Sequence, residues 1–320
     1  MKRKIFVGTL VLMMTLALFL SGCGGDNAES ESSGGTSEQE KPSVVVGSKE
    51  FTEQLVLGQI TIQLLEANGF EVEDKTGLGG SSVCREALMS GEIDLYWEYT
   101  GTAWMAHLGN DTPITESEEC YQKVKKADEE NGITWLSYAP MNNTYTIMMR
   151  QEDAEKLGIK SISDLAKAIN SGVEPPVGDK WTFATDHEYS IREDGLIGLQ
   201  ELYGFKFDDV PIMQVGITYG ALKDGKVATA MGFATDGRVG GFDLVNLEDD
   251  KHFHPVYNAA PNVRTETLEK YPQIKEVLEP VVPLLDNETM TTLNGKVDLD
   301  GMEPDQVAKE FLIENGLIKE

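Results

Sequence analysis

Short β-branched runs alternate with amphipathic stretches along most of this sequence, and this alternation constrains the fold more than any other feature. Residues 44–46 form a strand-like run, and residues 52–68 carry apolar side chains on one helical face until Gly69 interrupts the pattern. The next segments predict a strand around residues 70–75, a helix that Ser82 caps and that runs to Met89, and a strand at 93–96. A βαβαβ beginning of this kind is typical of α/β proteins.

The pattern continues through the second half of the chain, where Pro304 opens a terminal helix and Gly316 closes it. The overall prediction is an α/β protein with a largely parallel sheet or sheets. The further strands are expected at 145–149, 181–184, 227–233 and 244–247, and the further helices at 163–170 and 193–203.

The N-terminus has the layout of a secretory signal peptide. Three basic residues at positions 2–4 precede an uncharged apolar run at 5–20, which is too short for a permanent membrane span. The sequence LSGC at 20–23 resembles the lipobox of bacterial lipoproteins, in which the cysteine is diacylated after cleavage. We therefore expect a signal peptide at 1–22 and a lipid anchor on Cys23, which would hold the protein at the outer face of the cell membrane.

The segment that follows has a different composition from the rest. Residues 24–42 contain Gly, Ser, Glu, Asn and Thr but no large apolar side chain, so a flexible tether is expected up to residue 42. Residues 43–320 have the composition of a globular protein, long enough for one large domain or two modest lobes. The formal charge of −27 disfavours binding to nucleic acid.

Cysteine is rare, since only Cys84 and Cys120 remain in the body of the chain. Outside the cell these two thiols are able to form a disulfide, but their spacing does not demand one, and two free thiols fit the sequence equally well.

Enzymatic chemistry finds little support in the sequence. There is no G-x-S-x-G motif that would present a nucleophile. His252 and His254 are the best candidate pair of metal ligands, but they are interpreted as surface residues without such a role. Gly77, Gly79 and Gly80 are interpreted as a tight turn, because they lack the lysine of a phosphate-binding loop. We therefore expect neither enzyme activity nor a cofactor or metal.

Aromatic residues gather instead beside polar, turn-like segments at the ends of predicted strands, where they are well placed to wall a cleft. For any single ring, core packing is the simpler interpretation. The rings are Tyr99 within 98–102, Tyr145 after 142–144, Phe233 before 234–238 and Tyr257 before 258–261.

Seven segments together resemble one family, the glycine betaine, carnitine and choline binding lipoproteins of osmoprotectant ABC importers. The resemblance covers nearly all of the chain after the tether, and the segments occur in the family's order. They are GSKEFTEQ at 47–54, GLGG at 77–80, GEIDLYWEYTGT at 91–102, NNTY at 142–145, REDG at 192–195, FATDGR at 233–238 and LEDDKHF at 247–253.

The resemblance implies a type II periplasmic-binding-protein fold, in which two α/β lobes are joined by two crossover strands and the ligand lies in the interlobe cleft. Crossovers near residues 143 and 254 would give a discontinuous first lobe, 43–143 plus 255–320, and a continuous second lobe, 144–254.

The family's aromatic cage for a quaternary ammonium group is carried over to Tyr99, Tyr145, Phe233 and Tyr257. Phe233 stands where relatives often have tyrosine, so it keeps the ring face but loses the hydroxyl. The same resemblance assigns the carboxylate end of a betaine to Lys49 and Arg192, with Thr102 and Glu188 as further polar residues of the cleft.

Without the family, the two basic residues among these have plain alternatives. Arg192 is equally able to pair with Glu188 or Glu193 on the surface, and Lys49 with Glu50 or Glu53.

The expected function is capture of glycine betaine, carnitine, proline betaine or choline and its delivery to an ABC permease with its ATPase. A monomer is expected. The first alternative is a binding protein for another solute such as an amino acid, which would need a carboxylate to bind the ammonium group. A secreted esterase for choline or betaine esters is the second alternative, and it would need a nucleophile and a base.

Overall fold

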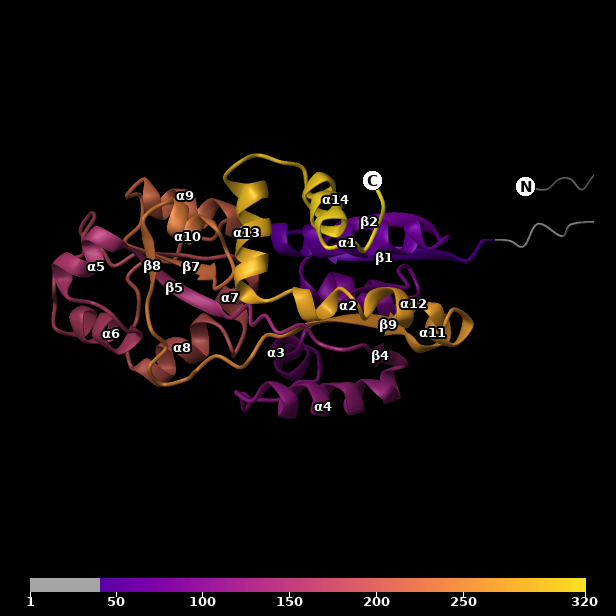
Figure 1. Cartoon of the computed structure of the whole chain (residues 1–320). Helices are drawn as coiled ribbons and strands as arrows, with labels where there is room; N and C mark the ends of the chain where they lie inside the picture. The colour runs from indigo at the N-terminus through magenta and orange to yellow at the C-terminus, as the bar shows by residue number, and fades with distance from the viewer. Residues whose placement is uncertain (1–40) are drawn as a thin grey trace, which may run out of the picture. The chain divides into compact units, whose positions relative to one another are not determined.

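The computed structural model describes residues 41–320 (Figure 1). The predicted signal peptide, the predicted lipidation site at Cys23 and all but the last two residues of the predicted tether lie outside the described residues. Within 41–320, no helix combines the length and the apolar character that a membrane span requires.

A five-stranded mixed sheet, in the order β2-β1-β3-β9-β4, forms the first half of the architecture. Strand β1 pairs in parallel with β2 and β3, whereas β9 lies antiparallel between β3 and β4. The bounds are β1 Ser43–Lys49, β2 Glu71–Gly79, β3 Leu95–Tyr99, β4 Ile133–Trp135 and β9 Ala259–Arg264.

The helix α1 lies on this sheet, in contact with β1, β2 and β3, and its Leu57, Ile60 and Leu65 are fully buried. It packs against α12, α13 and α14 from the C-terminal part of the chain. The helices of this half are α1 Thr52–Ala67, α2 Ser81–Ser90, α3 Thr100–Thr102, the π-helical η1 Ala103–His107, α4 Ser117–Asp128, the 3-10 turns η2 Glu129–Asn131 and η3 Val282–Leu284, α11 Thr265–Lys270, α12 Gln273–Leu278, α13 Asn287–Asp298 and α14 Pro304–Glu314.

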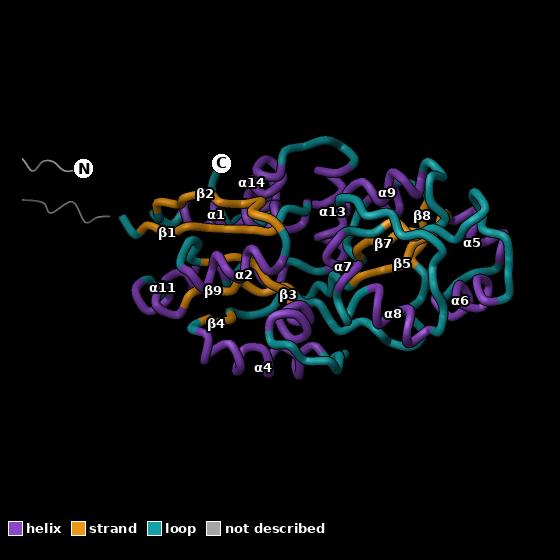
Figure 2. The backbone as a smooth tube through the Cα atoms, turned by 180° about the vertical axis from the view of Figure 1, so that it is seen from behind, coloured by secondary structure: helices purple, strands orange, loops and turns teal. Residues whose placement is uncertain are grey.

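A four-stranded sheet, in the order β6-β7-β5-β8, forms the second half, and Figure 2 shows its strands as a group separate from the first sheet. Strand β5 is antiparallel to β7 and β8, and β6 is parallel to β7. The bounds are β5 Tyr145–Arg150, β6 Phe183–Ala184, β7 Thr229–Phe233 and β8 Leu244–Asn246, with helices α5 Gln151–Leu157, α6 Ile162–Asn170, α7 His187–Ile191, α8 Leu196–Tyr203, α9 Val215–Lys223 and α10 Arg238–Gly241.

The chain passes between the two sheets twice, once at 136–144 and once at 247–258. The predicted crossovers near residues 143 and 254 fall within these connections, and the lobe limits drawn from them stay a prediction. The α/β class is confirmed.

The expectation of largely parallel sheets is wrong, because four of the seven strand pairs are antiparallel. Strands β5 and β9 enter their sheets directly from the other sheet, without the crossover helix that a parallel neighbour in the same sheet requires. Hydrophobic periodicity reports which residues are buried but not the direction of a strand, so the error could not be seen in the sequence.

Candidate functional site

A cavity of about 550 Å³ lies between the ends of the two sheets. Its wall includes the end of β1, the end of β3, the start of β5 and the end of β7, together with the start of α2, residues of α7, residues 212–215 and Tyr257. The cavity-lining residues used below are Lys49, Glu50, Phe51, Ser81, Tyr99, Thr102, Tyr145, Asp186, Glu188, Phe233 and Tyr257.

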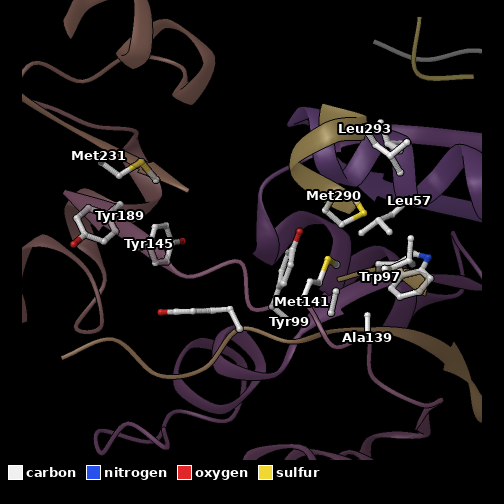
Figure 3. Close-up of a cluster of buried hydrophobic side chains, with 14 of the residues drawn as sticks. Leu57, Trp97, Tyr99, Ala139, Met141, Tyr145, Tyr189, Met231, Met290 and Leu293 are labelled. Atoms are coloured by element: carbon white, nitrogen blue, oxygen red, sulfur yellow. The ribbon is translucent and has the colours of Figure 1, made fainter. Parts of the chain in front are cut away.

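All four rings expected in the cage line this cavity. Tyr145 opens β5 and stands opposite Phe233, the last residue of β7, in the strand register, with ring centroids 5.4 Å apart. Tyr257 lies edge-on to Tyr145 at 5.3 Å. Figure 3 shows Tyr145 beside Tyr189, a buried ring 4.7 Å away that supports it from behind.

Phe51 is a fifth ring in the cavity wall, and the sequence reasoning missed it. It stacks on Phe233 at 5.1 Å and on Tyr99 at 6.3 Å, and so bridges rings that belong to different sheets. Its place between the end of β1 and the start of α1 was the available signal, because residues just after a strand often face a cleft.

The hydroxyls of two cage tyrosines are anchored by buried carboxylates. Tyr99 donates to Glu53 at 2.7 Å, and Tyr257 donates to Asp194 at 2.7 Å. Burial raises the pKa of Tyr99, Tyr145 and Tyr257 well above the usual value, so the phenols are neutral at physiological pH.

Lys49 lines the cavity but already has a partner of opposite charge. Its Nζ lies 2.5 Å from Oε1 of the fully buried Glu98 and 5.0 Å from the centroid of Tyr99. Burial acts to raise the pKa of Glu98, but Lys49 and His107 outweigh it and hold that pKa well below its usual range. The partner of Lys49 is thus Glu98, and the alternative of pairing with Glu50 or Glu53 is wrong.

Arg192 lies behind Tyr145, outside the lining of the cavity, with its guanidinium 5.7 Å from the ring centroid. Its Nε donates to Asp194 Oδ1 at 2.7 Å and its Nη2 to Oδ2 of the same carboxylate, while its Nη1 donates to Glu188 Oε1 at 2.7 Å. Of the two partners considered for Arg192, Glu188 is therefore confirmed, but the expected surface location is wrong, because Arg192 is buried. Asp194 had not been singled out from the sequence.

Glu188 reaches across the cavity, and Thr102 lies in its wall. The second carboxylate oxygen of Glu188 accepts the backbone N–H of Ser81, the first residue of α2, at 3.2 Å. Thr102 is almost fully buried in α3. Within residues 41–320, the structure thus brings every predicted site residue into the cavity lining except Arg192, which lies behind the ring of Tyr145.

The other sequence candidates lie outside the cavity. Cys84 and Cys120 are both buried and unpaired. His254 is buried and bonded to Asp249 and Tyr189, so its interpretation as a surface residue is wrong. No cluster of metal-binding side chains occurs among the residues that the structure describes.

The expected tight turn at Gly77 and Gly79 is instead the end of β2. Both glycines have positive φ, 77° and 145°, where a β-bulge shifts the pairing with β1.

The class of protein is defined by two β-sheets with their helices, two connections between the sheets and a cavity between the sheet ends. It is a solute-binding protein with the type II periplasmic-binding-protein fold. A family profile described as the substrate binding domain of ABC-type glycine betaine transport systems matches residues 42–314. The chain therefore belongs to this family, which comprises transport substrate-binding proteins rather than a class of enzymes.

Individual relatives support this assignment. A glycine-betaine-binding protein of Pseudomonas aeruginosa is 40% identical over 275 residues, which cover 85% of this chain and 88% of that protein. An ergothioneine transport permease/ergothioneine binding protein of Helicobacter pylori is 35% identical, over 87% of this chain and 48% of the longer relative. A solved structure described as a glycine betaine/carnitine/choline ABC transporter is 27% identical with a TM-score of 0.70, over 87% of this chain and all of that one.

Proposed function

We propose that this protein captures a quaternary ammonium osmoprotectant in the aromatic cavity and delivers it to the permease of an ABC importer. The convergence of five rings, Phe51, Tyr99, Tyr145, Phe233 and Tyr257, on one cavity is the observation that carries the proposal.

A trimethylammonium group has no N–H or O–H to donate, so hydrogen-bond acceptors cannot hold it. It is held by the negative faces of aromatic rings, each worth about 1–2 kcal/mol where water is excluded. Four or five such contacts are enough for micromolar binding once the cost of association is met. The neutral phenols of Tyr99, Tyr145 and Tyr257 are in the state that this recognition needs.

The other end of the ligand distinguishes the candidates. Lys49 and Arg192, the residues proposed for a betaine carboxylate, are both occupied by carboxylates of the protein. A zwitterion would have to share Lys49 with Glu98 or use the hydroxyl of Thr102, whereas choline needs no such exchange. Glycine betaine, carnitine, proline betaine and choline therefore remain the candidates, and the Helicobacter pylori relative adds ergothioneine, itself a trimethylated betaine.

In this proposal, binding is followed by closure about the connections at 136–144 and 247–258, and the closed form docks on the permease, whose ATPase drives import. The monomeric protein is held at the extracytoplasmic face of the membrane by a lipid on Cys23, with residues 24–42 as the tether.

The test is isothermal titration of the purified protein with these five ligands, comparing wild type with Tyr99→Ala. Saturable one-to-one binding is expected for wild type, and the variant should raise Kd about tenfold or more because it removes one ring. Tyr138→Ala is the matched control, since Tyr138 lies outside the cavity lining. The proposal would be refuted if wild type bound none of the five ligands, or if Tyr99→Ala bound them as tightly as wild type.

A second candidate function, capture of an amino acid, is favoured by one observation. Glu50, Asp186 and Glu188 line the same cavity, and a carboxylate is the group that holds a free ammonium ion. A set of amino acids therefore forms a further arm of the titration. Tight binding there, with none to the quaternary ligands, would establish this alternative.

A further inference from the structure

We propose that Glu53 is the positioning residue of the aromatic cavity, holding Tyr99 directly and the segments that carry Tyr145 and Phe233 through its other hydrogen bonds. The inference rests on the proposed function, because it assigns a role in shaping the same cavity. Glu53 itself does not line the aromatic cavity.

The carboxylate of Glu53 is buried, with 2% of the residue exposed, and accepts four hydrogen bonds. The donors come from four separate parts of the chain: β3, the first connection between the sheets, the loop after β7, and α13. They are Tyr99 Oη at 2.7 Å and Asn143 Nδ2 at 2.8 Å on Oε1, and Thr235 Oγ1 at 2.5 Å and Asn294 Nδ2 at 3.1 Å on Oε2.

Each of the first three donors belongs to a ring of the cavity or lies two residues from one. Tyr99 is itself a ring, Asn143 precedes Tyr145 by two positions, and Thr235 follows Phe233 by two. The two loops are also joined directly, because the N–H of Ala234 donates to the carbonyl of Thr144 at 3.0 Å. Glu53 therefore links the first sheet to the point where Tyr145 and Phe233 face each other.

Phe51 places a ring at the same point from the opposite direction. It lies two residues before Glu53 and stacks on both Tyr99 and Phe233. The start of α1 thus contacts these rings through a side chain in the cavity wall and through a carboxylate behind it.

The chemistry of the residue supports a functional role over a purely structural one. No Lys, Arg or His of residues 41–320 forms an ion pair with Glu53; its charge is met by the four donors and by the N-terminus of α1. Burial raises its pKa, and the four hydrogen bonds only partly oppose this. With a folded-state pKa above the unfolded one, any stability that the group contributes is lost as the pH rises through the folded value.

A neutral amide cannot replace the carboxylate in this network. A carboxylate offers acceptor sites on both oxygens, whereas Gln offers one oxygen and turns an NH₂ toward two of the donors. Glu53→Gln therefore keeps size and burial but breaks half of the network. The substitution also removes a buried charge that has no ion-pair partner, and this gain offsets the cost of the lost hydrogen bonds, so the midpoint of unfolding should not fall.

The experiment compares wild type, Glu53→Gln and Glu66→Gln by titration with glycine betaine, carnitine, proline betaine, choline and ergothioneine, and by thermal unfolding. Glu66 is exposed on the same helix, so Glu66→Gln makes the same change of charge without touching the network. We expect Glu53→Gln to raise Kd about tenfold or more at an unchanged or higher midpoint of unfolding, and Glu66→Gln to change neither. Unchanged affinity in Glu53→Gln, or a loss of affinity that accompanies a lower midpoint, would overturn the inference.

A ligand-free measurement separates this inference from the proposed function. In protein with ¹³C-labelled tyrosine rings, Glu53→Gln should shift the ring signals of Tyr99, which Tyr99→Phe assigns by removing them. Such a shift in a protein that binds none of the ligands would uphold the positioning role and refute the osmoprotectant assignment. Unchanged Tyr99 signals would refute the positioning role whatever the ligand.

Discussion

At the scale of a single residue, Asp186 is a carboxylate in the cavity wall whose pKa is raised by burial. It caps α7 by accepting the N–H of Tyr189 at 2.8 Å and also lines the cavity near Glu188. Burial is the main cause that raises its pKa to about 6, and the neighbouring carboxylate of Glu188 adds to the effect, although the cap hydrogen bond opposes it. Ionisation of Asp186 at neutral pH therefore lowers the free energy of unfolding of the protein.

Asp186→Asn should therefore stabilise the protein at neutral pH while keeping the helix cap, since Asn is also a good capping residue. The stability associated with Asp186 is present below its unfolded pKa and is lost as the pH rises through about 6. We expect a gain of about 1 kcal/mol in the free energy of unfolding at pH 7.5, fading toward pH 4, measured by urea denaturation across this range. A gain that is the same at pH 4 and pH 7.5 would contradict the assigned cause.

At this scale, the sequence predicted the ring residues better than their supports. Tyr99, Tyr145 and Phe233 stand in segments that resemble a family and lie at strand ends, and Tyr257 lies just before β9. Glu53 was read only as one possible partner of Lys49, because the residues that bind it are spread along the chain as far as Asn294, 241 positions away. Asp194 was missed because a carboxylate two residues from Arg192 looks like surface charge until the fold buries both.

At the scale of elements, neighbouring residues of the short strand β3 have different roles, one in the cavity wall and one in a buried ion pair. Tyr99 at its end faces the cavity, while Glu98 before it is buried beneath and contacts Lys49 at the end of β1. Glu98 also accepts from the hydroxyl of Tyr96 and lies 2.8 Å from His107 in η1. The strand ends are thereby held together by one carboxylate.

Glu98→Gln should be strongly destabilising, because it leaves the charge of Lys49 buried without a partner. Removing one member of a buried ion pair typically costs about 3 kcal/mol or more, which urea denaturation at pH 7 would measure. Glu92→Gln, at an exposed surface pair with Lys75, is the control and should change stability by less than about 1 kcal/mol. A loss below about 1 kcal/mol in Glu98→Gln would show that solvent reaches Lys49.

Element positions were largely predictable, but strand direction was not. The helix expected at 52–68 is α1 Thr52–Ala67, because an apolar face and a following glycine at positive φ mark its extent. The helix expected from residue 193 begins only at Leu196, since a turn with the N–H of Gly195 bonded to Arg192 precedes it. Antiparallel insertion of β5 and β9 depends on contacts between distant segments, which no local pattern records.

At the scale of the whole molecule, one main apolar core contains buried residues from both sheets, including Trp97 of β3 and Ile147 of β5. The cavity lies where this core opens between the strand ends, and its lining includes residues of both sheets, so a ligand bound there would contact both sheets at once.

We therefore expect a bound ligand to stabilise the entire fold. At a ligand concentration one hundred times Kd, mass action predicts a gain of about 2.7 kcal/mol in the free energy of unfolding, with a single denaturation transition. Tyr99→Ala at the same ligand concentration is the control and should show a smaller gain. Two separate transitions, of which only one responds to ligand, would show that the ligand contacts a single half.

The two buried cysteines have a practical consequence for following closure. Burial raises the pKa of Cys84 to about 12 and that of Cys120 to about 11, so neither thiol ionises at neutral pH and neither will react readily with maleimide dyes. New cysteines placed at exposed positions on the two halves, Lys126→Cys in α4 and Glu155→Cys in α5, would therefore be labelled selectively within residues 41–320. Fluorescence energy transfer between the two dyes would then report opening and closing of single molecules, with both native cysteines left in place.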